Sequence, residues 1–385
     1  MLWRSKNGCL VYCLLGIFVG RLVIGYLVNW LLGYLVKLVY FMKSVKIIRK
    51  GLVKLVEVDI PVPKVGEVLL RVHLIGLCGS DLSSFLGKNP LVNYPVVPGH
   101  EIAAEIVELG SEVPDHFVPG QMLTVNPYTN CGVCPSCRKG RINACQFNQT
   151  LGVQRDGALS EYVVVKWEKI LVEDSLSPAE LALTEPLSVG FHAVARGQVT
   201  DTDTVVILGC GMIGAGAIIG AAVRGARVIA VDIDENKLNT AKLLGAKYTI
   251  NSKTESLNKK LLEITAEDGP DVIIEAAGNP ATYLAAVNEV AFTGRVVCIG
   301  YANSDIAFAT KIFVQKELDI LGSRNALQAD IQAVINYLKE KTCPVDQLIT
   351  KVVRPEETGD ALQEWAEEPG KVMKILVGFE SEERK

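Results

Sequence analysis

Four of the 10 cysteines in this chain fall in one short stretch, NCGVCPSCRKGRINAC, and are Cys131, Cys134, Cys137 and Cys145. A disulfide between neighbours in this run would be strained, because cysteines separated by two residues rarely reach the geometry of an S–S bond. An iron–sulfur cluster suits the first two gaps, but the last gap is seven residues long and no proline follows Cys145. We therefore predict a structural zinc site, in which four thiolates close a tetrahedron and leave no position for a substrate.

A second set of residues has the composition of an open metal site. It comes from the segments GLCGSD and VPGHE and contains Cys78, Ser80, Asp81, His100 and Glu101. A thiolate, an imidazole and a carboxylate are ligand types of a catalytic zinc, which keeps one coordination position free. Each of these residues also has an ordinary explanation when it is taken alone. A lone cysteine, for example, is more often a buried apolar residue than a metal ligand. We expect His73 and His116 to be solvated or structural. His192 is close in sequence to Glu185 and could support the site from outside it.

A third motif predicts a dinucleotide site. The segment VVILGCGMIGAG contains Gly209-x-Gly211-x-x-Gly214 between a predicted strand and a helix, and the next strand ends in Asp232. The glycines let the backbone approach a pyrophosphate at the helix N-terminus, and the carboxylate accepts hydrogen bonds from the adenosine ribose. Because that carboxylate repels a 2′-phosphate, NAD is favoured over NADP. The alternative is a tightly packed βαβ unit without nucleotide. The residues assigned to the cofactor are Gly209, Gly211, Met212, Ile213, Gly214, Asp232, Gly278 and Gly300.

The elements around these motifs fall into two classes. Short β-rich runs punctuated by proline and glycine occupy the chain from Met42 to about Val165, and a helical stretch begins at Pro178. From Thr204 strands and helices alternate at the spacing of βαβ units, which predicts a doubly wound parallel sheet. We expect a barrel-like β-rich catalytic domain at 42–195, a Rossmann domain at 196–341, and a return of 342–385 to the first domain.

Composition restricts the function further. A chain of 385 residues with 49% hydrophobic residues is long enough for two cores. The net charge of −4 gives no support to a nucleic-acid partner. Mostly unpaired cysteines point to a reducing compartment, so we expect a cytoplasmic protein.

The first 41 residues do not fit this description. They are heavily apolar, but Arg21, Asn29 and Lys37 interrupt them, and the run Leu22–Val36 has 15 residues. A membrane-spanning helix needs about 20 apolar residues, and no signal-peptide cleavage site is clear. We favour a natural start at Met42, which would make 1–41 a start-site artefact, over a membrane anchor.

Together the motifs resemble the zinc-containing medium-chain dehydrogenases, from Met42 to about Phe379. The resemblance extends to Lys316-Glu-Leu318, to Gly322-Ser323 and to the segment TEPLSVGFHAVARG. In that segment Glu185 stands where the alcohol dehydrogenases proper have a cysteine. The Glu-Pro-Leu-Ser form looks like that of sorbitol and other polyol dehydrogenases.

The resemblance implies a GroES-like catalytic domain, a Rossmann domain, two zinc ions, NAD and a homodimer or homotetramer. The catalytic zinc would be held by Cys78, His100 and a carboxylate. Glu101 and Glu185 are both candidates, one bound directly and the other directly or through water. Zinc would lower the pKa of the substrate hydroxyl, Ser80 would relay its proton, and Asp81 would orient a ligand histidine. The hydride would pass to NAD.

The substrate is expected to be a sugar acid. The segments GSRNA and LGVQRDGALSEY supply the candidate substrate residues Arg324, Asn325, Gln154 and Arg155. Arginine can hold a carboxylate through two parallel hydrogen bonds, and the pair of segments resembles the L-galactonate and L-gulonate 5-dehydrogenase branch. The alternatives are a neutral polyol of the sorbitol type, an L-threonine-type substrate, and a metal-stabilised nucleotide-binding protein that is not an enzyme.

Overall fold

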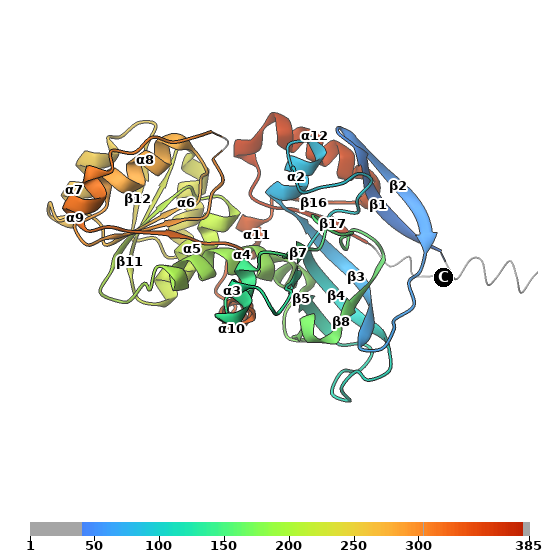
Figure 1. The fold of residues 1–385 in the computed structure, drawn as a ribbon. Helices are drawn as coiled ribbons and strands as arrows, with labels where there is room; N and C mark the ends of the chain where they lie inside the picture. The colour runs from blue at the N-terminus through green and yellow to red at the C-terminus, as the bar shows by residue number, and fades with distance from the viewer. Residues whose placement is uncertain (1–40, 303, 380–385) are drawn as a thin grey trace, which may run out of the picture. The chain divides into compact units, whose positions relative to one another are not determined.

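The computed structural model describes residues 41–302 and 304–379 (Figure 1). The predictions for the apolar N-terminal segment therefore lie outside the described residues, apart from Phe41. No helix in the described ranges has the length and hydrophobicity to cross a bilayer. The described residues divide into two units, one of 41–43 and 57–60 and the other of 44–56, 61–302 and 304–379. All the sites discussed below belong to the second unit.

A mainly antiparallel sheet carries the first set of motifs. Seven strands form it, in the order β16-β17-β3-β4-β5-β9 with β8 on β3. Its C-terminal strand β17 pairs with β3, as predicted for the returning tail. The strands are β3 (Glu67–Leu77), β4 (Glu101–Leu109), β5 (Met122–Val125), β8 (Tyr162–Lys166), β9 (Ile170–Val172), β16 (Lys351–Val353) and β17 (Ile375–Gly378). A smaller two-stranded sheet joins β1 (Phe41–Arg49) to β2 (Leu52–Asp59), and another joins β6 (Tyr128–Thr129) to β7 (Gln149–Thr150).

A parallel sheet carries the dinucleotide motif. Its six strands have the order β12-β11-β10-β13-β14-β15, which is the order of a Rossmann fold. The strands are β10 (Thr204–Leu208), β11 (Arg227–Asp232), β12 (Tyr248–Asn251), β13 (Val272–Glu275), β14 (Arg295–Cys298) and β15 (Asp319–Gly322). All five strand pairs are parallel. The predicted fold class is therefore confirmed, whereas the boundaries at 195 and 341 stay a prediction.

Alternate residues of the parallel sheet face two separate cores. Val205 and Ile207 pack with α5, while Val206 and Leu208 pack with α8 on the other face. Figure 1 shows helices on both faces of this sheet. The helices are α5 (Met212–Val223), α6 (Glu235–Leu243), α7 (Leu257–Thr265), α8 (Pro280–Glu289), α9 (Lys311–Lys316) and α10 (Gln328–Lys339).

One long helix, α4 (Pro178–Arg196), packs against both sheets and carries Glu185 and His192. It begins with a capping box, in which the Ser177 hydroxyl accepts from the Glu180 amide and the Glu180 carboxylate accepts from the Ser177 amide. It continues through Pro186, so the helical stretch predicted from Pro178 is one uninterrupted helix. Close packing requires a glycine at 190, because a Cβ there would lie 2.2 Å from the Ala217 nitrogen of α5.

The remaining elements are short. They are α2 (Gly79–Phe85), α3 (Pro135–Arg138), η1 (Ile142–Ala144), η2 (Trp167–Lys169), α11 (Val345–Leu348), η3 (Pro355–Glu357), α12 (Thr358–Glu367) and η4 (Pro369–Lys371). Strand β16 begins at Lys351, shortly after α11 ends at Leu348.

Candidate active site

Three of the predicted zinc ligands converge at the ends of β3 and β4. Cys78 caps α2 directly after β3, and His100 and Glu101 lead into β4. One donor atom from each lies within 4.8 Å of the other two. Burial opposes a charge on the His100 imidazole, but the neighbouring Cys78 and Glu185 outweigh it and raise the pKa of the ring well above its ordinary value. The trio therefore has the spacing and the anionic character of a cation site.

Glu101 is held by a lysine that the motifs did not reveal. The Lys374 ammonium lies 2.6 Å from Glu101 Oε1 and 3.0 Å from the Leu77 carbonyl oxygen, and both charged side chains are buried. Burial lowers the pKa of Lys374, but Glu101 and Cys78 outweigh this effect and raise it. The sequence carried one signal for this ion pair, a lysine within the apolar segment KVMKILVG. A charged residue in a buried strand needs a partner of opposite charge.

Glu185 lies beside the trio on α4. Its Oε1 accepts a short hydrogen bond from the Tyr128 hydroxyl, another residue that sequence reasoning missed. Burial raises the pKa of the Glu185 carboxyl, and burial together with this carboxylate raises the pKa of Tyr128 well above its ordinary value. Glu101 therefore belongs to the compact group of candidate ligands, whereas Glu185 is hydrogen-bonded to Tyr128.

Asp81 fixes two backbone segments of the site. Its fully buried carboxylate accepts from the Cys78 amide at 2.9 Å and from the Gly99 amide at 3.2 Å. These bonds hold the residues next to the ligand histidine, and none goes to the His100 ring. Asp81 thus positions His100 through the backbone, which differs from the expected contact with an imidazole.

Three buried polar atoms at this site have no hydrogen-bond partner in the described chain. They are Ser80 Oγ, His100 Nδ1 and Glu101 Oε2. Buried polar atoms are normally paired, so orphaned atoms beside a sulfur–nitrogen–oxygen donor set fit a bound ion and its ligand. The set matches the ligand preferences of zinc.

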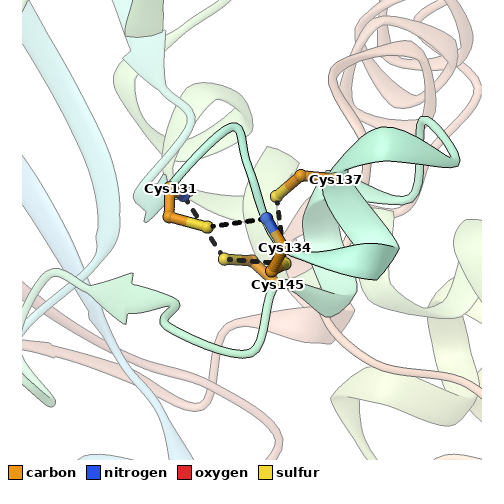
Figure 2. A group of neighbouring side chains, drawn as sticks. All are labelled: Cys131, Cys134, Cys137 and Cys145. Carbon is orange, nitrogen blue, oxygen red and sulfur yellow. Dashed lines mark hydrogen bonds between the residues drawn. The ribbon is translucent and has the colours of Figure 1, made fainter.

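The four-cysteine lobe brings its sulfurs together without a disulfide (Figure 2). The Cys134 sulfur lies 3.5 Å from that of Cys137 and 3.8 Å from that of Cys145. Tetrahedral zinc with its ordinary sulfur bonds separates thiolates by about 3.8 Å. Hydrogen bonds from the Ser136 hydroxyl, 3.1 Å from the Cys134 sulfur, and from the Cys137 and Gln146 backbone together lower the pKa of that thiol to about 5. The geometry fits the predicted structural zinc.

The glycine motif forms a cradle at the start of α5. Gly209 has a φ of +95°, and a Cβ on Gly214 would lie 1.9 Å from the Gly209 oxygen, so both positions require glycine. A Cβ on Gly211, the N-cap of α5, would meet no atom within 4 Å, which leaves room for a phosphate. Met212 and Ile213 form the first turn of this helix. The cradle fits a pyrophosphate.

Asp232 ends β11 next to this cradle. Its Oδ2 accepts from the Cys210 amide at 2.7 Å, while Oδ1 accepts from the amides of Ile233 and Asp234. The carboxylate is therefore fixed by backbone donors at the place where a ribose is expected. A cavity of about 400 Å³ is lined by Asp234, two residues after Asp232, and by Lys237. Lys237 was not among the predicted cofactor residues.

The two later cofactor glycines contact each other. A Cβ on Gly300 would lie 2.2 Å from the Gly278 nitrogen, so the loops after β13 and β14 approach closely. Glu275 holds the first of these loops, because its buried Oε1 accepts from the amides of Ala277 and Gly278. The structure thus places both glycines at the carboxyl edge of the parallel sheet.

The four candidate substrate residues have different surroundings. Gln154 Oε1 accepts from the Thr150 amide, and the Asn325 amide donates to the Asn143 carbonyl oxygen, so both make structural contacts. Arg155 is exposed. Arg324 is a half-buried residue, and its guanidinium makes no hydrogen bond or ion pair within the described ranges.

The other histidines are structural. His73 pairs with Glu105 at 3.1 Å, and the His116 ring packs on that of Phe117 with centroids 4.3 Å apart. His192 does not contact Glu185. It bonds Asp330 and Asn143.

Comparison with known proteins agrees with this geometry. The alcohol dehydrogenase GroES-like domain matches residues 64–174, and the zinc-binding dehydrogenase domain matches 213–340. L-galactonate-5-dehydrogenase of Escherichia coli is 32% identical over 76% of this chain and 86% of its own. Sorbitol dehydrogenase of Bacillus subtilis is 33% identical over 83% of this chain and 92% of its own. RspB of E. coli, described as a short chain alcohol dehydrogenase and solved with NADH, superposes with a TM-score of 0.82 at 30% identity, covering 88% of this chain and all of the other.

The chain belongs to the zinc-binding dehydrogenases. It falls among the polyol and sugar dehydrogenases of that family. Its assignment as an oxidoreductase that uses Zn²⁺ and NAD is confirmed at the level of the family. The alternative of a nucleotide-binding protein without catalysis does not agree with this membership.

Proposed function

We propose that this enzyme oxidises the C5 hydroxyl of a six-carbon sugar acid of the L-galactonate or L-gulonate type and transfers the hydride to NAD. The observation that carries the sugar-acid assignment is the half-buried residue Arg324, whose guanidinium has no anionic partner within the described ranges. A guanidinium can hold a substrate carboxylate through two hydrogen bonds. The identity with L-galactonate-5-dehydrogenase supports the same substrate class.

In this proposal Cys78, His100 and Glu101 Oε2 hold the catalytic zinc. The bound ion supplies a Lewis acid that lowers the pKa of the substrate hydroxyl. Lys374 neutralises the other oxygen of Glu101 and keeps the carboxylate in place. The Ser80 hydroxyl, which is buried and unpaired, takes the substrate proton onward. Glu185, bonded to Tyr128, adds negative charge beside the site.

Asp232 selects the cofactor. Its fixed carboxylate accepts from the ribose hydroxyls of NAD and repels the 2′-phosphate of NADP. The cradle of Gly209, Gly211 and Gly214 receives the pyrophosphate, and Met212 and Ile213 supply amides at the first turn of α5. Gly278 and Gly300 border the nicotinamide half. Arg155 and Gln154 are proposed to contact the far end of the substrate.

Initial rates with L-galactonate, L-gulonate, sorbitol and L-threonine, each with NAD and with NADP, test the assignment. The sugar acids with NAD are expected to give the highest kcat/KM. Equal activity on sorbitol would return the enzyme to the neutral-polyol group, to which its sorbitol dehydrogenase relative belongs. Preference for L-threonine would contradict both assignments.

The kinetics of an Arg324 variant test whether this residue binds the substrate. Arg324→Ala should raise the KM for the sugar acid by the equivalent of about 2–5 kcal/mol, the cost of losing a buried charge partner, and should leave NAD binding unchanged. Arg49→Ala, the same substitution at an exposed position of β1, is the control. An equal effect of the two variants on KM would remove Arg324 from the substrate site.

A further inference from the structure

A buried hydrogen-bond chain joins the four-cysteine lobe to the segment that carries Arg324. The Asn143 amide nitrogen of η1 lies 2.8 Å from His192 Nε2 on α4 and 2.8 Å from the Arg324 carbonyl oxygen. His192 Nδ1 lies 2.7 Å from Asp330 Oδ2 on α10. The Asn325 side-chain amide donates back to the Asn143 carbonyl oxygen at 3.1 Å. The side chains of Asn143, His192 and Asp330 are all buried.

The direction of each bond follows from its partners. A backbone carbonyl only accepts, so the nitrogen of the Asn143 amide must face Arg324, and its second hydrogen points to His192 Nε2. That ring nitrogen is therefore the acceptor. The His192 proton is on Nδ1 and is donated to Asp330. The same Asp330 oxygen accepts from the Leu327 amide at 2.8 Å, at the other end of the segment.

The segment between β15 and α10 has two other anchors, the buried side chain of Ala326 in the core and one backbone bond. Ser323 extends the sheet pairing through one bond to the Cys298 carbonyl oxygen. Asn325 has a φ of +53°, which asparagine adopts more readily than most residues but which no regular element would maintain. The contacts of Arg324 and Asn325 with Asn143 thus fix the middle of this segment.

The fold of the four-cysteine lobe determines the position of Asn143. It lies in η1 between Cys137 and Cys145, and the Cys145 amide closes this turn on the Ile142 carbonyl oxygen. A lobe this short has a core of cysteine side chains with Ile142 packed against them, so its fold depends on what the sulfurs hold.

We propose that Asn143 and His192 are positioning residues through which the four-cysteine lobe sets the place of Arg324 in the substrate site. The lobe then influences substrate affinity without touching the substrate. The assignment of Arg324 to the substrate rests on the proposed function, whereas the link between lobe and segment does not.

The test compares two near-isosteric substitutions in the lobe. Asn143→Asp removes both side-chain N–H donors, whereas Asn148→Asp changes another buried asparagine whose amide bonds only the nearby Thr150. In Asn143→Asp, hydrogen exchange of the amides of 322–327 should become faster by about tenfold or more, the cost of unsatisfied buried groups. The KM for the best substrate of the panel should rise by a similar factor. The NAD dissociation constant, the zinc content and kcat should change less than twofold.

The exchange measurement needs no substrate, so it separates this inference from the proposed function. Faster exchange at 322–327 with a raised KM for whichever substrate is accepted supports the link, even if that substrate is a neutral polyol. Exchange or KM values in Asn143→Asp that equal those in Asn148→Asp overturn it. Should Asn143→Asp fail to fold, His192→Phe removes the acceptor from the side of α4 and carries the same two expectations.

Discussion

The two carboxylate oxygens of Glu101 have different surroundings. Oε1 faces the Lys374 ammonium at 2.6 Å, and Oε2 has no hydrogen-bond partner among the described residues. Without Lys374, the metal ion would be the only cation beside this buried carboxylate. The lysine lets Glu101 keep its position and its charge whether or not an ion is present.

Lys374→Met should lower the free energy of unfolding by about 3–5 kcal/mol, because the substitution leaves Glu101 buried without its partner. Thermal and urea denaturation measure the change. Adding Glu101→Gln should recover part of the loss, since the pair is then removed as a whole. Lys371→Met, at an exposed pair with Glu368, should cost no more than about 1 kcal/mol. A Lys374→Met protein as stable as that control would show that the pair does not matter.

Asp232→Ala should weaken NAD binding and narrow the preference for NAD over NADP. The carboxylate loses its bonds to the ribose, and the repulsion of a 2′-phosphate disappears with it. Fluorescence titration with NADH and NADPH measures both constants. Asp234→Ala is the control, because that carboxylate caps α6 by accepting from the Asn236 and Lys237 amides. A wild-type enzyme that prefers NADPH would contradict the assignment.

At the scale of elements, the register between β3 and β4 assembles the catalytic site. Gly76 on β3 lies opposite Glu101 on β4, and Ile375 of β17 lies opposite Leu77. This register brings Cys78, Glu101 and Lys374 to one end of three neighbouring strands. A Cβ on Gly76 would lie 1.9 Å from Glu101 Oε2, so the register leaves room for that carboxylate only beside a glycine.

Gly76→Ala should displace the Glu101 carboxylate and remove most of the catalytic zinc. The expected metal content falls from two ions per chain toward one, and activity falls with it. Gly370→Ala is the control, because a Cβ there meets nothing within 4 Å. Metal analysis of the two purified proteins shows whether Gly76→Ala displaces the Glu101 carboxylate or is tolerated. Full zinc content and activity in Gly76→Ala would contradict the placement of Glu101 Oε2.

We expect the fold of the lobe from Cys131 to Cys145 to depend on a bound metal ion. Cys134→Ser removes the sulfur that lies within 3.8 Å of both Cys137 and Cys145. We expect loss of one zinc per chain and a lower unfolding temperature, with a secondary loss of activity. Cys210→Ser, at a buried cysteine outside both metal sites, is the control for loss of a thiol. Iron in the purified protein, or retention of both zinc ions by Cys134→Ser, would contradict a structural zinc.

Across the whole molecule, short motifs were predictable and distant partners were not. The cysteine run, the glycine motif and the ligand trio are local patterns whose spacing carries the chemistry. Lys374 meets Glu101 only because β17 pairs with β3, and Tyr128 meets Glu185 only because β6 packs in one core with α4. The role of Asn143 could not be predicted for the same reason, since its partners lie on two distant segments, α4 and the segment between β15 and α10. Pairings of this kind depend on tertiary packing, which no residue spacing encodes.

The parallel sheet ends at a strand with an exposed face. β15 pairs with β14 on one side, and no other strand of the described chain pairs with it. Ile320 on this strand and Val314 on the preceding α9 are exposed apolar residues. An open edge of this kind invites pairing with another strand. Two copies related by a two-fold axis can satisfy both edges at once, which agrees with the predicted homo-oligomer.

We therefore expect sedimentation of the purified enzyme at micromolar concentration to give a dimer or a tetramer. Ile320→Lys should shift it toward smaller species, because each interface would then bury two like charges near the axis. Val62→Lys, at an exposed apolar position outside the parallel sheet, should leave the assembly unchanged. If wild-type protein sediments as a monomer, the oligomer prediction is wrong. If Ile320→Lys keeps the wild-type assembly, the interface lies elsewhere and the edge of β15 is covered by some other means.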